Sequence, residues 1–125
     1  MEKAQQLKSS RDILLRLHKS LVDFEREGFE RFNGPMTSGQ FLNVLLNDSG
    51  FEWLRKFSTL IVEIDEMFDL DDGYSEEMVD ANLKKITDLV DMTVADEYFV
   101  AKYQFALQNV PEITILHTEL KQSLA

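Results

Sequence analysis

The strongest constraint on the fold is a helical repeat of apolar residues in the first quarter of the chain. Residues 3–32 contain no proline and only one glycine. Side chains spaced by three and four residues share one face of a helix, so this stretch predicts a helix about 45 Å long. A compact domain of this size is narrower, so one end should project or bend at the glycine. The repeating positions are Leu14, Leu17, Leu21, Phe24 and Gly28.

The same period returns along the rest of the chain, interrupted by turn and capping residues. Thr37 with Gln40, and Ser49 with Glu52, have the spacing of capping boxes. No glycine or proline interrupts residues 75–109, so one continuous helix is conceivable there. We favour a break at Thr93, because Asp96 follows three residues later. The expected helices after the first are 38–47, 50–69, 75–92, the segment from the break to 109, and a last one beginning at 111.

Alternating strand patterns are nearly absent, and the expected connections are short. Short links between amphipathic helices favour antiparallel neighbours. The sequence therefore predicts an all-α fold, an up-and-down helical bundle of four main helices plus one or two short helices. We expect residues 1–125 to form a single domain, because a chain of 125 residues buries roughly two-thirds of the surface of its unfolded form.

The charge balance limits the classes of partner. The chain carries 23 acidic and 13 basic residues, for a net charge of −10. This field repels phosphate backbones and anionic lipid headgroups, so we expect neither nucleic acid nor membrane as a partner. The chain has no cysteine and no uninterrupted apolar stretch of the ~18 residues that a membrane span requires. A cytoplasmic location is expected.

Three segments in the first half of the chain carry a resemblance to known proteins. They are Asn-Gly-Pro-Met-Thr-Ser-Gly-Gln-Phe-Leu at 33–42, Phe-x-Trp-Leu-Arg at 51–55, and Leu-Ile-Val-x-Ile-Asp-Glu at 60–66. Together they resemble a set of small bacterial helical proteins of unknown function. The resemblance implies a bacterial cytosolic setting and no particular activity.

Ionisable residues on the expected apolar faces are the first candidates for a site. His18 and Glu25 fall in the middle of the first helix's apolar arc, His117 lies on an inward line, and Asp65 lies at the edge of an apolar face. Two imidazoles and two carboxylates would suit zinc or ferrous iron. The Glu-x-x-His spacing of di-iron bundles is absent, so core residues satisfied by neighbours are the favoured interpretation, and no cofactor is expected.

Aromatic residues near the C-terminus are the second candidates. Tyr98 and Phe105 lie seven residues apart on a line distinct from that of Phe99 and Tyr103, and Trp53 could join them. Aromatic residues are enriched at protein interfaces, so we expect Tyr98, Phe105 and Trp53 to be available for partner binding.

Two functions remain open from the sequence. The preferred one is a non-enzymatic protein-interaction or regulatory module that binds another protein or itself as a homodimer. The alternative is a metal-binding or enzymatic helical bundle that uses His18, Glu25, Asp65 and His117. A small apolar ligand inside the bundle is a third arrangement, because sites between helices are common.

Overall fold

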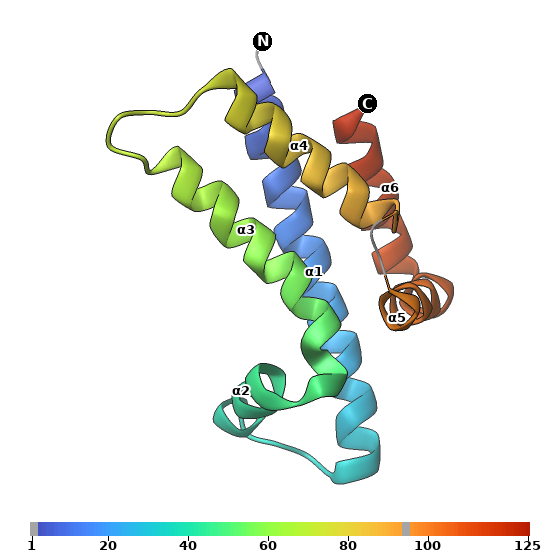
Figure 1. Ribbon diagram of the computed structural model, residues 1–125. Helices are drawn as coiled ribbons and strands as arrows, with labels where there is room; N and C mark the ends of the chain where they lie inside the picture. The colour runs from blue at the N-terminus through green and yellow to red at the C-terminus, as the bar shows by residue number, and fades with distance from the viewer. Residues whose placement is uncertain (1–2, 94–95) are drawn as a thin grey trace.

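A computed structural model describes residues 3–93 and 96–125 of the chain. The described residues form helices and contain no strand, which confirms the all-α prediction (Figure 1). The elements are α1 Lys3–Asn33, α2 Ser38–Asn47, the 3-10 helix η1 Ser49–Leu54, α3 Arg55–Phe68, α4 Glu76–Val90, α5 Glu97–Asn109 and α6 Pro111–Leu124.

The long helix α1 organises the molecule. It packs against α3, α4 and α6, and its C-terminal part reaches η1. Its inward line includes Leu14, Leu17 and Leu21, all fully buried, as the apolar repeat predicted. Helical structure continues through Gly28, so the helix is not interrupted there. The C-terminal end of α1 instead extends past the main group of helices towards α2 (Figure 1).

Of the two helix caps expected around α2, the structure contains the first and not the second. Thr37 and Gln40 form the predicted capping box, in which each side chain accepts a hydrogen bond from the other's backbone N–H. Ser49 does not cap the next helix. Asp48 takes that position, with Oδ1 accepting from the Gly50 N–H at 2.7 Å. A 3-10 helix then precedes α3, so the single α-helix expected over 50–69 is wrong in its first turn.

The second half of the chain contains the predicted break. Helices α4 and α5 are separate, and Asp96 caps α5 by accepting from the Phe99 N–H at 2.8 Å. Thr93, the expected start of this helix, instead donates its hydroxyl hydrogen to the Asp88 carbonyl oxygen. Met92, two residues after the end of α4, lies in the left-handed region with φ 59°. Residues 94 and 95 lie outside the described part of the chain.

An aromatic cluster fills the core where η1, α3, α5 and α6 meet α1. The Phe57 ring stacks on Phe99 at 5.8 Å between centroids and meets Tyr103 edge-on at 5.7 Å. Trp53 contacts Phe57 and Phe99 edge-on. Offset and edge-to-face pairs each add about 0.5 to 1.5 kcal/mol beyond the burial of area, so this cluster stabilises the fold by more than its apolar burial alone.

Candidate functional site

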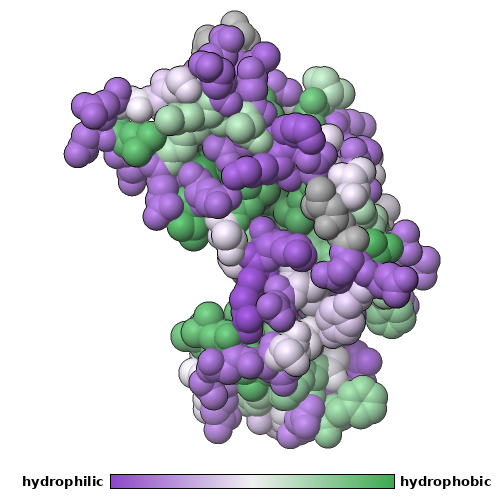
Figure 2. All heavy atoms as spheres, viewed as in Figure 1, coloured by the Kyte–Doolittle hydropathy of each residue, from purple (hydrophilic) through white to green (hydrophobic). Residues whose placement is uncertain are grey.

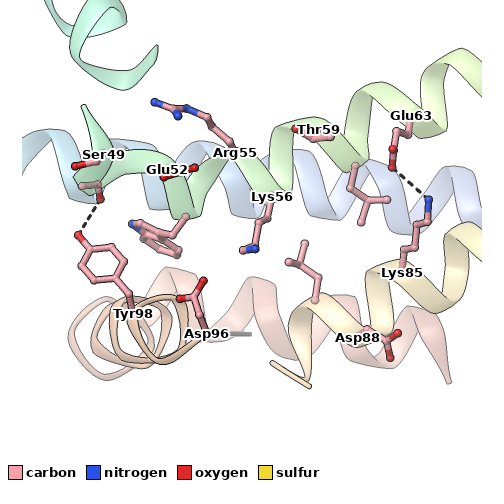
Figure 3. A pocket seen from close by; sticks show the side chains of 14 residues that line it. Ser49, Glu52, Arg55, Lys56, Thr59, Glu63, Lys85, Asp88, Asp96 and Tyr98 are labelled. Atoms are coloured by element: carbon pink, nitrogen blue, oxygen red, sulfur yellow. Dashed lines mark hydrogen bonds and ion pairs between the residues drawn. The ribbon is translucent and has the colours of Figure 1, made fainter. Parts of the chain in front are cut away.

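An open groove lies between α3 and η1 on one side and α4 and α5 on the other (Figure 3). Its volume is about 1100 Å³. The base of the groove is apolar. It is formed by three buried side chains, Trp53 of η1, Leu60 of α3 and Leu89 of α4. Hydrophobic bases with polar edges are typical of binding sites in proteins.

Charged and polar side chains surround this apolar base. At one end the Lys85 ammonium lies 3.5 Å from a Glu63 carboxylate oxygen, which links α4 to α3. At the other end the Tyr98 hydroxyl donates to the Gly50 carbonyl oxygen at 2.9 Å, which links α5 to η1. Lys56 points into the middle of the groove in Figure 3. Both ends are thus tied across the groove, while the centre is open.

The edge of the groove carries both signs of charge. Lys56 and Lys85 supply cations, and the acidic side chains are Glu52, Glu63, Asp88 and Asp96, whereas the guanidinium of Arg55 points away from the groove towards α2. The described lining residues include no histidine, so no lining hydroxyl has an imidazole base beside it. An apolar centre with a mixed polar rim is the arrangement that protein interfaces commonly have.

The two acids of the predicted metal set are engaged in separate ion pairs. Asp65 accepts two hydrogen bonds from the Arg11 guanidinium, at 2.9 and 2.7 Å. The buried Glu25 carboxylate accepts from Trp53 Nε1 at 3.3 Å and lies 3.0 Å from the Lys102 ammonium. Both acids are therefore satisfied by partners on other elements, which is the alternative that the sequence favoured.

The two histidines contact different members of the aromatic cluster. His117 Nδ1 is 2.7 Å from the Tyr103 hydroxyl oxygen, and the His18 ring stacks on Phe57 at 6.2 Å between centroids. Across residues 3–93 and 96–125, no three histidine or acidic side chains are grouped as metal ligands. The structure therefore does not assemble His18, Glu25, Asp65 and His117 into one site.

Burial lowers the pKa of both imidazoles. Desolvation alone lowers the pKa of His18. For His117 desolvation is the main cause, the Lys121 ammonium lowers the pKa further, and Asp91 opposes the shift. Desolvation also raises the pKa of the buried Tyr103 hydroxyl. The surroundings of these rings therefore favour their neutral forms.

Stability should fall as the pH is lowered through the range in which histidine titrates. Because the folded state binds these protons less readily than the unfolded state, stability is fully present above about pH 6.5 and is lost below it. His18→Phe keeps the ring stacked on Phe57 and removes the titrating group. Urea unfolding between about pH 7 and 5.5 should then show a shallower decline than in the wild type. Identical declines would contradict this assignment.

The three predicted partner residues separate into two locations. Tyr98 and Phe105 are about half exposed, as expected, whereas Trp53 is only 3% exposed and belongs to the core. Trp53 nevertheless lines the groove beside Tyr98, so its part in partner binding stays a prediction. Phe105 lies elsewhere, with its ring 5.9 Å from Phe24.

The groove itself could not be recognised from the sequence. Lys56, Leu60 and Leu89 belong to helices α3 and α4, and their spacing along the chain does not reveal that they face one another. The only local signal was the tryptophan at position 53 beside a capping segment. The groove is formed by η1, α3, α4 and α5, and its existence depends on how these four elements pack together.

Comparison of the chain with protein-family models, curated proteins and solved structures found no match. The fold and the groove by themselves describe an all-α protein with an open surface groove that carries charges of both signs. Within the described residues, no helix has both the length and the apolar character needed to cross a membrane.

Proposed function

We propose that this chain is a non-enzymatic protein-interaction or regulatory module that binds a segment of another protein in the groove. The observation that carries the proposal is the groove's construction, with Trp53, Leu60 and Leu89 at its base and charges of both signs at its edge. Amphipathic helices and extended segments dock in such grooves by burying apolar side chains and pairing their flanking charges. The binding partner is protein, with no part for nucleic acid or membrane.

The proposal includes an architecture and a setting. Helices α1, α3, α4 and α6 act as the four main helices of an up-and-down bundle, with the others as additions. Their directions in Figure 1 support this, because α1 and α4 run downwards and α3 and α6 run upwards. The absence of cysteine suits a reducing cytoplasm, and the resemblance of the first half of the chain to small bacterial helical proteins implies a bacterial one.

The metal-binding or enzymatic alternative has weaker support. Asp65 is held by Arg11, and Glu25 is held by Trp53 and Lys102. A metal ion would have to displace these charge-assisted contacts, and the two histidines would have to leave the aromatic cluster. The residues of that set are better explained as parts of the bundle's interior.

Filling the groove should weaken partner binding without unfolding the protein. Thr59 is an exposed groove residue on α3, and Thr59→Trp places a large side chain over the apolar base. The partner would be isolated from cells that express the protein, and its affinity for the purified chain measured by calorimetry. We expect Thr59→Trp to bind at least about 10-fold more weakly, a loss of about 1.4 kcal/mol.

A matched control separates the effect of filling the groove from the effect of adding an exposed tryptophan anywhere on the surface. Thr118 is an exposed threonine on α6 outside the groove, so Thr118→Trp makes the same change elsewhere. This variant should bind the partner like the wild type. Equal binding by the wild type, Thr59→Trp and Thr118→Trp would exclude the groove as the binding site. Failure to find any protein partner would count against the interaction function itself.

A further inference from the structure

The groove of the proposed binding site continues along two of the helices that form it. A second, smaller hollow of about 350 Å³ lies between α3 and α4. Glu63 and Lys85 line both hollows, so the two join along one surface. Figure 2 shows hydrophobic residues between α3 and α4, with hydrophilic residues around them. We call this joined surface the α3–α4 seam and define it by Leu60, Glu63 and Met67 of α3 and Asn82, Lys85 and Leu89 of α4.

Each helix contributes one continuous stripe to the α3–α4 seam. The three seam residues of each helix are spaced by three and four, so each set lies on a single helix face. The Lys85 ammonium lies 3.5 Å from a Glu63 carboxylate oxygen. One turn further along α3, the Met67 sulfur lies 3.4 Å from Asn82 Nδ2. The stripes are therefore antiparallel and face one another. From Lys56 to Met67 the lined face of α3 is about 16 Å long.

The base of the seam is apolar, and the ion pair that crosses it is exposed. Leu60, Met67 and Leu89 are all buried. The side chains of Glu63 and Lys85 are 46% and 55% exposed. Ion pairs between exposed side chains contribute little to stability, so a bound segment can displace this pair or lie over it. The seam can therefore accept one segment along its whole length.

The backbone of the surrounding elements favours a helix as the occupant over an extended segment. Extended segments commonly dock by main-chain hydrogen bonds to the edge of a sheet, and residues 3–93 and 96–125 form no strand. Helices α3 and α4 use their backbone groups internally, so an extended backbone buried between them would lack partners. A helix satisfies its own backbone groups and packs lengthwise against a pair of helices.

The charge around the seam favours a cationic occupant. The described residues that line the two hollows include five acids, which are Glu52, Glu63, Glu66, Asp88 and Asp96. Only Lys56 and Lys85 oppose them, because the Arg55 guanidinium donates to carbonyl oxygens at the end of α2. The whole chain carries a net charge of −10. Complementary charge speeds encounter and disfavours partners of like charge, so we expect lysine and arginine beside the occupant's apolar side chains.

We propose that the occupant of the α3–α4 seam is a cationic amphipathic helix of a partner protein, which lies along α3 and α4 and covers both hollows. Its apolar side chains, spaced by three, four and seven residues, contact Leu60, Met67 and Leu89, and its basic side chains face the surrounding acids. This inference rests on the proposed function and specifies the structure and charge of the partner segment. It also adds the second hollow to the binding site.

Two synthetic peptides of about 14 residues, or two heptads, test the structure and charge of the occupant. Both carry leucine at the a and d positions, and every other position is lysine in one peptide and glutamate in the other. We expect the lysine peptide to bind the wild-type chain at least about 10-fold more tightly by calorimetry. Isolated helices of this length are marginal in water, so circular dichroism should show that the lysine peptide gains helix on binding.

A substitution in the second hollow tests whether the helix covers both hollows. Ala81 is exposed on α4 and lines only the second hollow, so Ala81→Trp fills that hollow without entering the first. The lysine peptide should bind this variant at least about 10-fold more weakly than the wild type. Ala101 is exposed on α5 and lines neither hollow, so Ala101→Trp is the matched control and should bind normally. Circular dichroism should show the wild-type helix content in both variants.

Three results would overturn the cationic helix. They are a lysine peptide that binds no more tightly than the glutamate peptide, binding without a gain of helix, and binding that Ala81→Trp leaves intact. The isolated partner separates this inference from the proposed function. If Thr59→Trp weakens partner binding while Ala81→Trp does not, the partner occupies the first hollow alone, so the helix along the seam is wrong and the proposed function stands.

Discussion

Replacing Phe57 with alanine is expected to lower the free energy of unfolding by about 3 to 5 kcal/mol. Phe57 is fully buried, and its ring contacts Trp53, Phe99, Tyr103 and His18. The variant loses the transfer free energy of the ring and leaves a cavity that four surrounding rings cannot easily fill. Because a domain's total stability is about 5 to 15 kcal/mol, the loss is a large fraction of it.

Urea unfolding followed by circular dichroism measures this loss, and an exposed phenylalanine provides the control. Phe32 on α1 is 88% exposed, so Phe32→Ala should change the unfolding free energy by less than about 0.5 kcal/mol. Equal effects of the two substitutions would contradict the placement of Phe57 at the centre of the aromatic cluster.

Replacing Glu25 with leucine should lower the unfolding free energy by about 2 to 3 kcal/mol. The substitution removes the carboxylate that pairs with Lys102 and accepts from Trp53 Nε1. Removing one partner of a buried pair costs more than the pair itself contributes, because the remaining charge stays desolvated. The ammonium of Lys102 is partly exposed, which keeps the expected loss below that of a fully buried pair.

A second substitution separates the lost ion pair from the changed packing. Glu25→Leu combined with Lys102→Met removes both charges, so the double variant should recover about 1 kcal/mol of the loss. The exposed pair of Lys19 with Asp23 is a control, and Asp23→Ala should cost less than about 0.5 kcal/mol. A double variant less stable than Glu25→Leu alone would show that Lys102 is not held by Glu25.

Local patterns predicted the helices well because the determinants of a helix lie within a few residues. The apolar line of α1, the capping box at Thr37 and the proline that begins α6 all act through neighbours in the chain. The misassigned caps at Ser49 and Thr93 have a common reason. In both cases a nearby aspartate, Asp48 or Asp96, was the better acceptor for the free backbone N–H groups.

The candidate site could be predicted only in part, because it depends on contacts between distant segments. The sequence indicated that Glu25 is buried and needs a partner, yet Lys102 lies on α5 and could not be singled out by spacing. Asp65 was placed at a helix edge, and its partner Arg11 lies 54 residues away. Trp53 was named only as a candidate for partner binding, and the sequence did not reveal that η1 directs it into the aromatic cluster at the base of the groove.

The central claim, that this chain acts by binding a protein segment in its groove, is tested most directly by the affinity of the isolated partner for the wild type and for Thr59→Trp. The claim predicts that filling the groove weakens binding at least about 10-fold while Thr118→Trp leaves it unchanged. An affinity that is the same for the wild type and Thr59→Trp would contradict it.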